Sequence, residues 1–589
     1  MLLFANPTSD GNPKDKEFIT MISLYPIIQN ASIIGGHSIS GDLDYLVKLN
    51  IAKDAWLKGI NIYDSYILAK MVDENKIEKG AYGLENLFCS KYKFESWKKD
   101  TQEFIEAGHV EALSPDQRMT RCRMDAWASG ILIRDYLREC KVPPRTIEFT
   151  HRIALTLHRM GLAGAAINLS ELNSLTNQWK SLSFQSYDLL QKEAFKYGLA
   201  GFEPTNDNHI RELLYKKLLL KPPVKTKKTN KPSVAKPSLL KLNHPICNLI
   251  VRYNKYNKLA STWAGDKFSE YIDIIDDETG LMHFWLNPSK ARTGRRSSGG
   301  EEQEGVASRN SQNWPPEARK IVKSRWKKGR IGVVDFSRIE VVNQAWLCKD
   351  TKLLDYFLNG DGYIGVAKEL FNQVVVPGTL IYKAVKAIVL GVQYNLQKYN
   401  MAKHLWDMGF KLSSDFETHI EKTEEKRQLY FAKFPGLKYY INKRLVELAK
   451  TQQIVNPIGR IRHLPHGGPA TEGYWRLENQ AINYNSQSMA SDITGSVLID
   501  FEEAMLANYE LSYTEWHQML LKNPLDLPFS VLINEVHDEV DIDLHPDTGD
   551  KDLEMLVESA RRLHTFRGLL PEFDIIPNVS VKVAESWGG

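Results

Sequence analysis

Apolar and polar residues alternate most regularly near the end of the chain, and this alternation predicts β-strands. Residues 540–544 read Val-Asp-Ile-Asp-Leu, a period of two that is typical of a half-buried strand. The apolar run at residues 530–536 precedes them and predicts the other strand of a hairpin. His537 and Asp538 then fall at the turn between the two strands.

Other apolar patterns predict many helices and a few further strands. Short strands are expected at residues 32–36, 331–334 and 579–583, and longer helices at residues 145–200, 379–410 and 415–450. Residues 216–241 hold nine lysines and four prolines with few large apolar side chains, so we expect a mobile basic segment there. Such a segment is either a solvated linker or a contact for nucleic acid, and its composition favours neither.

The length and composition indicate a multidomain globular protein. With 589 residues, the chain is too long for one hydrophobic core, so we expect about two to four packed units. The five cysteines form no CxxC pair, which argues against a zinc site or a disulfide framework and fits reduced thiols. The sequence has no apolar run of membrane-spanning length and no signal-peptide pattern, so we expect a cytoplasmic protein without membrane contact.

Two aspartates stand at predicted strand ends that are far apart in the chain. Asp335 follows the apolar residues 331–334, and Asp538 lies at the predicted hairpin turn. If folding brings them together, two such carboxylates can hold a pair of divalent cations, which stabilise the attacking and leaving oxygens of a phosphoryl transfer. An aspartate at a strand end is more often a cap or turn residue, so neither position is diagnostic alone.

Six segments occur together in an order that a known family shares. They are Thr293-Gly294-Arg295-Arg296-Ser297-Ser298, Asn310-Ser-Gln312-Asn313, Asp335-Phe-Ser-Arg-Ile-Glu340, Lys386-Ala-Ile-Val-Leu390-Gly391-Val-Gln-Tyr394, Ala481-Ile-Asn483-Tyr-Asn-Ser-Gln487 and Val536-His537-Asp538-Glu539. In this order they resemble the motifs of family A DNA polymerases, the bacterial DNA polymerase I type.

The resemblance implies an α/β and α+β multidomain fold shaped like a right hand. Residues 1–140 would form a partial ribonuclease H-like 3′–5′ exonuclease domain, and residues 141–589 the polymerase domain. The resemblance places a thumb at residues 185–285, a palm at 286–360 and 496–589, and fingers at 361–495. It implies a monomeric, template-directed DNA polymerase that adds deoxynucleotides to a primer 3′ end by two-metal phosphoryl transfer, with primer–template DNA and deoxynucleoside triphosphates as partners.

The same resemblance assigns the metal and DNA contacts. Asp335, Asp538 and the backbone carbonyl of Phe336 would hold two Mg²⁺ ions, with Mn²⁺ as a substitute. Glu539 would support the site, and its alternative is an ordinary solvated strand residue. The expected contacts to primer and template are Arg295, Asn310, Gln312, Asn483, Gln487 and His537, with loop stabilisation as the alternative for Asn310 and Gln312.

Nucleotide binding is assigned to one helix face and one glutamate. Lys386, Leu390 and Tyr394 are spaced by four residues, so they share a face. Lys386 would neutralise the triphosphate, while Leu390 and Tyr394 would face the base and sugar; the alternative is an amphipathic helix that buries both in a core. Glu340 would occupy the space of a ribose 2′-hydroxyl and so select deoxynucleotides.

The chain departs from the family pattern at several of these positions. Tyr382 stands where the family has an arginine that grips the triphosphate, and the adjacent Lys383 is the candidate substitute. Arg338 replaces a glutamine, Leu390 a phenylalanine and Asn395 a glycine. Because the leucine variant is associated with viral members of the family, we expect a bacteriophage origin and a role in the host cytoplasm.

Residues 20–140 resemble the proofreading exonuclease more faintly. Asp42 and Asp125 match two of its metal-binding aspartates, but Arg121 replaces its tyrosine and is expected to pair with Asp125. The exonuclease family begins with a strand that carries an Asp-x-Glu motif, and this chain lacks that strand. Asp15-Lys-Glu17 has the matching residues, but it lies too close to Asp42 to serve as the motif. With at most two of four carboxylates, we expect no proofreading by this chain alone. The domain is then either an inactive structural remnant or one that a separate polypeptide completes.

Two other functions compete with this interpretation. A single-subunit RNA polymerase of the same fold is disfavoured by Glu340 and the His-Asp-Glu turn. A catalytically inactive DNA-binding scaffold is disfavoured by the intact Asp335, Asp538 and Lys386.

Overall fold

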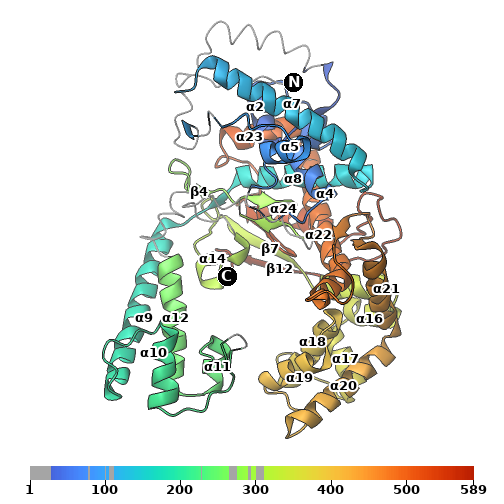
Figure 1. Ribbon diagram of the computed structural model, residues 1–589. Coiled ribbons are helices and arrows are strands. Elements are labelled where there is room, and N and C mark those ends of the chain that lie inside the picture. Colours follow the sequence, from blue (N-terminus) through green and yellow to red (C-terminus); the bar gives the residue numbers. More distant parts are fainter. Residues whose placement is uncertain are drawn as a thin grey trace.

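In the computed structural model, a small central sheet is flanked by two helical groups and capped by an N-terminal domain (Figure 1). The structure describes residues 28, 30–76, 78, 80–99, 101, 103–104, 112–226, 229–263, 275–288, 294–299 and 311–589. Asp15, Glu17, Thr293 and Asn310 therefore lie outside the described residues. Within the described part of the chain, no helix is both long and apolar enough to cross a membrane.

The central sheet has four antiparallel strands in the order β10-β11-β7-β12. Their bounds are β7 Arg330–Phe336, β10 Val531–Val536, β11 Glu539–Leu544 and β12 Val579–Ala584. The predicted hairpin and the strands expected at residues 331–334 and 579–583 are confirmed. Val540, Ile542 and Leu544 are fully buried, which explains why alternation was a reliable signal for β11.

Three helices pack on this sheet and carry most of its core. They are α8 Pro144–Ala163, α22 Tyr474–Asn508 and α24 Gly549–Ala560. A buried ion pair joins α8 to α22: Arg159 donates from Nε and one terminal nitrogen to the two Glu502 oxygens at 2.6 Å each. The Trp516 indole of α23 (Tyr513–Lys522) also donates to Glu502, at 3.1 Å. This network connects three elements behind the sheet.

One helical group follows β7 in the chain, and it includes the helix predicted to bind nucleotide. Its members are α15 Ile339–Leu347, α16 Thr351–Leu358, α17 Gly362–Phe371, α18 Leu380–Gln393, α19 Lys398–Asp407, α20 Phe416–Lys433 and α21 Pro435–Thr451, followed by the β8 Gln453–Val455 and β9 Ile461–His463 hairpin. The single helices expected at 379–410 and 415–450 are wrong, because each is two helices. Asn395 adopts a left-handed conformation (φ 53°) that ends the first, and Pro435 starts a new helix in the second.

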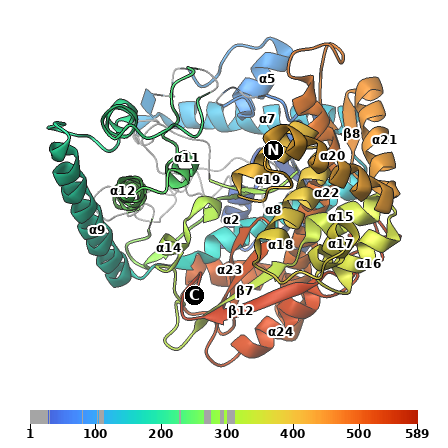
Figure 2. The same cartoon turned by 90° about the horizontal axis from the view of Figure 1, so that it is seen from below.

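The other helical group is built on two long helices, α9 Leu169–Lys196 and α12 Pro245–Thr262. Figure 2 shows this pair on the opposite side of the molecule from α16, α17 and α21. Shorter elements complete the group: α10 Asp207–Arg211, the π-helical turn Glu212–Lys217 and α11 Lys236–Lys241.

The expectation that residues 216–241 form a mobile segment is wrong for residues 229–241. Val234 and Leu239 are buried against α9 and α12, and Ser238 hydrogen-bonds Ser233 at 2.9 Å. The Tyr215 hydroxyl donates to the Ser233 carbonyl at 2.7 Å. A few apolar residues placed at the right spacing are therefore enough to fold a lysine-rich stretch.

The N-terminal domain contains a parallel two-stranded sheet covered by helices. Its elements are β1 Ile34–Gly36, α2 Ser40–Lys48, α3 Asp54–Leu57, β2 Ile62–Asp64, α4 Ser65–Val72, α5 Leu84–Tyr92 and α7 Pro115–Glu139. Short pieces link it to the rest of the chain: β3 Ala165–Ala166 pairs with β4 Leu281–Met282, β5 Leu286–Asn287 pairs with β6 Ser297–Ser298, and a 3₁₀ turn Ser311–Asn313 precedes α14 Pro316–Arg319.

Candidate functional site

Three carboxylates predicted from distant parts of the chain meet at one end of the central sheet. Asp335 on β7 lies opposite Glu539 on β11 and opposite Ser580 on β12. Asp538 sits in the β10–β11 turn, where its carbonyl accepts the Phe336 N–H at 3.1 Å. The structure thus brings together the two aspartates and the glutamate that the sequence singled out.

Without bound cations, the three carboxylates repel one another, and ionising the two aspartates is unfavourable. Burial raises the pKa of Asp335 to about 6, and the negative charges of Asp538 and Glu539 add to this shift. Burial also raises the pKa of Asp538, although Arg295 opposes the rise. A half-buried group of carboxylate oxygens with repelling charges is a donor set that fits hard divalent cations such as Mg²⁺.

Glu539 is held in place by two side chains that the sequence analysis did not identify as site residues. The Arg319 guanidinium donates to Glu539 Oε1 at 3.1 Å, and the Trp587 indole donates to the same oxygen at 3.2 Å. Arg319 also stacks 4.4 Å from the Trp587 ring centroid. Glu539 is therefore not an ordinary solvated strand residue. No local sequence signal connects α14 with the end of the chain, so only the fold reveals this support.

Glu340 on α15 is fixed by contacts to two other elements. One carboxylate oxygen pairs with Arg295, and the other accepts the hydroxyl hydrogen of Tyr394, the residue that follows α18. Gln487 of α22 donates to the same tyrosine hydroxyl at 3.4 Å. Asn483, one turn earlier on α22, is buried. Arg295, Glu340, Tyr394 and Gln487 thus form one polar cluster.

The predicted nucleotide face of α18 is not the face that α18 buries in the core. The fully buried residues of α18 are Ala384, Val385, Ile388, Val389 and Val392. Lys383 and Lys386 are exposed, and Leu390 is half-buried. Leu390 also packs against the main hydrophobic core, so partial burial of Leu390 in that core stays the alternative to a nucleotide contact.

Gln312 has a clear structural role in the loop that precedes β7. Its side-chain amide lies 3.5 Å from the Arg296 carbonyl oxygen and 3.4 Å from the Glu535 carbonyl oxygen. Arg296 itself is buried and donates to Glu535 Oε1 at 2.7 Å. His537, by contrast, is exposed at the β10–β11 turn with a left-handed φ of 62°.

The N-terminal domain contains a second carboxylate cluster, which includes a member the sequence analysis missed. Burial raises the pKa of Asp42 to about 6, and Asp64 and Asp125 are among the negative charges that add to the rise. Asp64 ends β2 and accepts the backbone N–H groups of Ser38 at 2.9 Å and Tyr66 at 2.8 Å. Asp64, which the sequence analysis did not name, therefore lies close enough to Asp42 for its charge to raise the pKa of Asp42. Its position at a strand end was the available signal.

Asp125 is paired, but not with the residue expected. Lys98 Nζ lies 3.3 Å from Asp125 Oδ1, and the Trp97 indole donates to the same oxygen at 2.8 Å. Arg121 instead donates to the Thr101 hydroxyl at 2.7 Å. The prediction of an Arg121–Asp125 pair is wrong, because Asp125 already has a nearer cation in Lys98.

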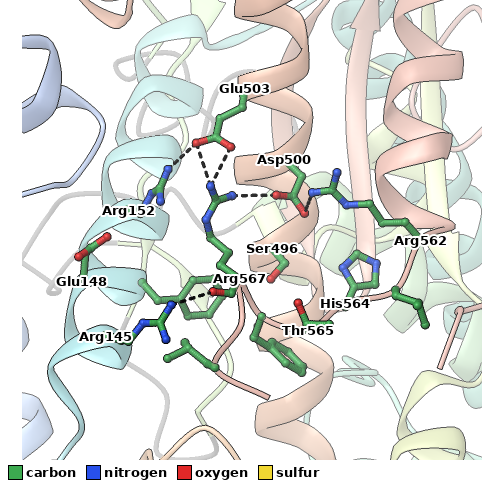
Figure 3. Close-up of a pocket in the computed structure, with 14 residues that line it drawn as sticks. Arg145, Glu148, Arg152, Ser496, Asp500, Glu503, Arg562, His564, Thr565 and Arg567 are labelled. Atoms are coloured by element: carbon green, nitrogen blue, oxygen red, sulfur yellow. Dashed lines mark hydrogen bonds and ion pairs between the residues drawn. The ribbon is translucent and has the colours of Figure 1, made fainter. Parts of the chain in front are cut away.

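A separate cavity of about 650 Å³ lies between α8, α22 and residues 562–569 (Figure 3). Arg567 crosses it, with one terminal nitrogen 2.9 Å from Asp500 and the other 2.9 Å from Glu503. Arg562 also pairs with Asp500, and Arg152 with Glu503. None of the three carboxylates at the sheet end lines this cavity, and two of its acidic residues, Asp500 and Glu503, are paired with arginines.

Comparisons with known proteins agree on one family. The model for DNA polymerase family A matches residues 172–589. DNA polymerase I of Geobacillus stearothermophilus is 24% identical over 468 residues, which are 75% of this chain and 48% of that protein. DNA polymerase I of Pseudomonas aeruginosa is 27% identical over 422 residues, 69% of this chain and 41% of that protein. The chain therefore spans about half, or less, of the length of these two relatives.

A solved structure shows the same fold. It is described as the POL domain of Pol1 from M. smegmatis in complex with DNA primer-template and dNTP. The TM-score is 0.72 at 18% identity, over 98% of this chain and 89% of that one.

The raised pKa of Asp335 gives a prediction for stability without metal. Because the folded-state pKa of about 6 exceeds the ordinary value of 3.8, ionised Asp335 destabilises the folded protein, and this effect grows as the pH rises from 4 through 6. Asp335→Asn should therefore raise the Tm of the metal-free protein by about 1–3 °C at pH 8 and leave it nearly unchanged at pH 4. Calorimetry with chelator checks this.

The change in Tm on adding Mg²⁺ provides a second test of the same site. Mg²⁺ should raise the Tm of the wild-type protein at pH 8 and have less effect on Asp335→Asn, because the variant lacks one ligand and needs less charge compensation. A variant that melts lower than the wild type at pH 8, with an unchanged response to Mg²⁺, would contradict the assignment.

Proposed function

The chain belongs to DNA polymerase family A, and we propose that it extends a primer 3′ end with deoxynucleotides, on a DNA template, by two-metal phosphoryl transfer. The observation that carries the proposal is the convergence of Asp335, Asp538 and Glu539 at one end of the sheet. The family match and the shared fold support it. Under this proposal the sheet, α15, α16 and α24 belong to the palm, α17–α21 belong to the fingers, and the second half of α9 with α10–α12 belongs to the thumb.

The metal ligands in this proposal are Asp335, Asp538 and the Phe336 carbonyl, with Mg²⁺ or Mn²⁺ as the ion. When bound, the ions would activate the primer 3′-hydroxyl and neutralise charge on the departing pyrophosphate. Arg319 and Trp587 orient Glu539 toward this edge. Burial raises the pKa of Asp335 to about 6, so without metal this carboxyl group is about half protonated near pH 6.

The substrate contacts follow from the polar cluster and the α18 face. Lys386 would neutralise the triphosphate, and Leu390 and Tyr394 would support the base and sugar. Glu340, fixed by Arg295 and Tyr394, would exclude the ribose 2′-hydroxyl. Primer–template contacts are proposed for Arg295, Asn310, Gln312, Asn483, Gln487 and His537.

Leu390 supports the proposal of a bacteriophage origin and of action in a host cytoplasm. The proposal of a monomer comes from the family resemblance alone.

The N-terminal domain is proposed to be an inactive exonuclease remnant in this chain. Lys98 places a positive charge beside Asp125, where a metal would need free carboxylate oxygens. Asp64 uses its oxygens on backbone N–H groups of its own domain. Completion by a separate polypeptide remains the rival proposal.

We predict that Asp335→Ala or Asp538→Ala slows primer extension by at least about a thousandfold, because each removes a metal ligand. Affinity for primer–template DNA should persist, since it comes mainly from phosphate contacts elsewhere. Single-turnover extension and a DNA-binding titration measure the two effects. Asp550→Ala is the control, because that carboxylate is 87% exposed and pairs only with Arg330 in the described structure. Near-normal extension by either active-site variant would rule out the metal assignment.

A second prediction concerns sugar selection. Glu340→Ala should raise the efficiency of ribonucleotide incorporation relative to deoxynucleotide incorporation by about tenfold or more, because a shorter side chain leaves room for the 2′-hydroxyl. Tyr394→Phe removes the hydrogen bond but keeps the carboxylate, so it should change this ratio less. Equal losses with both sugars in Glu340→Ala would show that Glu340 only holds the helices together.

A third prediction is that the purified chain does not remove a mismatched 3′ nucleotide. Asp64 already accepts backbone N–H groups and Asp125 already pairs with Lys98, so this cluster offers a metal pair fewer free oxygens than three unpaired carboxylates would. A 3′-labelled mismatched primer, incubated with Mg²⁺ and no nucleotides, provides the measurement. Cleavage that Asp42→Ala abolishes would show that the domain is active.

A further inference from the structure

Two cations from different elements gather near the N-terminal end of the proposed nucleotide face. Arg338 lies just before α15, and its guanidinium carbon is 5.7 Å from the Tyr363 ring centroid. Lys386 of α18 places its Nζ 5.8 Å from the same centroid. Tyr363 opens α17, so one aromatic ring has two cations within cation–π distance.

The Arg338 side chain is held by a carboxylate that a second residue also contacts. Arg338 lies 3.1 Å from Asp361 Oδ2, and the Tyr382 hydroxyl donates to the same oxygen at 2.9 Å. The Arg338 side chain is still 31% exposed. Its backbone is left-handed, with φ 60° and ψ 30°, which is uncommon for a residue other than glycine or asparagine. This backbone geometry fixes where the side chain leaves the turn.

These two cations lie at one end of the helix face that is proposed to bind the nucleotide. Tyr382 and Tyr394 are 12 residues apart, which is about 18 Å along a helix. Tyr394 donates to Glu340 at one end of this length, and at the other end Tyr382 and Arg338 both donate to Asp361. Lys386 lies one turn after Tyr382. The same face is therefore polar and anchored near the proposed sugar, apolar at Leu390, and positively charged at the far end.

We infer that Arg338 binds the triphosphate of the incoming nucleotide together with Lys386, and that Asp361 is the counter-ion it leaves to do so. The inference rests on the proposed polymerase function. Position 382 carries a neutral hydroxyl rather than a cation, so α18 supplies less positive charge than the family pattern would. A planar guanidinium suits phosphate oxygens through paired hydrogen bonds. The exposed Lys383 makes no contact that would direct it to Asp361 or Tyr363 in the described structure.

Moving the charge between positions 338 and 382 tests the inference in primer extension by the full chain. Arg338→Gln should raise the KM for the incoming deoxynucleotide by about tenfold or more, because a charged hydrogen-bond partner is lost. The Kd for primer–template DNA should not change. Adding Tyr382→Arg to this variant returns a cation to the same place and should recover most of the loss. Lys383→Ala should have a smaller effect on the KM than Arg338→Gln.

The variant Asp361→Asn distinguishes substrate binding by Arg338 from a purely structural role of the Arg338–Asp361 ion pair. Asp361 Oδ1 caps α17 by accepting the Tyr363 N–H at 3.1 Å, and asparagine caps helices equally well. If the Arg338–Asp361 ion pair only holds the two segments together, Asp361→Asn and Arg338→Gln should raise the KM for the nucleotide by similar factors. Substrate binding predicts that Asp361→Asn lowers it, because the competing negative charge is gone.

The outcomes distinguish this inference from the proposed function. A wild-type chain that extends primers while Arg338→Gln has an unchanged nucleotide KM overturns the role of Arg338 alone. The role of Arg338 is also overturned if the double variant Arg338→Gln/Tyr382→Arg has the same nucleotide KM as Arg338→Gln. An equal rise in the nucleotide KM of Asp361→Asn overturns it as well. A wild-type chain that does not extend primers contradicts both the proposed function and this inference.

Discussion

The antiparallel pairing of β7 with β11 is the constraint on which the candidate site depends. It places Asp335 opposite Glu539 and brings the Asp538 turn within hydrogen-bond distance of Phe336. Because side chains alternate between the two faces of a strand, a register slip of one residue would turn Asp335 to the other face. The apolar residues that fix the register are Val334, Val540 and Ile542, all fully buried. The hydrophobic core therefore determines the geometry of the acidic edge.

Buried ion pairs hold the surrounding elements to this sheet. Arg296 binds Glu535 on β10, Arg325 donates to Asp543 on β11 at 2.8 Å, and Arg159 binds Glu502 behind the sheet. Each pair joins segments that are more than two hundred residues apart or that belong to different layers. Such pairs add little net stability compared with apolar residues of similar size, but losing one partner is costly because the other charge stays buried. They specify which segments meet.

The sequence predicted the elements with strong local signals and missed contacts between distant segments. Alternation predicted β11, the apolar run before it predicted β10, and Asp335 and Asp538 were placed at strand ends that the structure brings together. The break at Asn395 was missed because helical apolar spacing continues on both sides of it, and only a left-handed residue interrupts it. Pro435 is a local sequence signal for the second break, because it begins α21. Support of Glu539 by Arg319 and Trp587, and of Asp125 by Lys98, depends on tertiary structure and has no local pattern.

The contact of the N-terminal domain with helices α8 and α23 has a consequence for which of its residues can change in evolution. Asp44 of α2 accepts from His158 of α8 at 2.8 Å and from His517 of α23 at 2.7 Å. Burial would raise the pKa of Asp44, but these two hydrogen bonds lower it to about 2. His517 is fully buried, and its Nδ1 has no partner among the described residues, so replacing Asp44 would leave both ring nitrogens unsatisfied. A lineage with no use for nuclease chemistry could lose Asp125 with little penalty, whereas Asp44 would stay under purifying selection as a joint between domains.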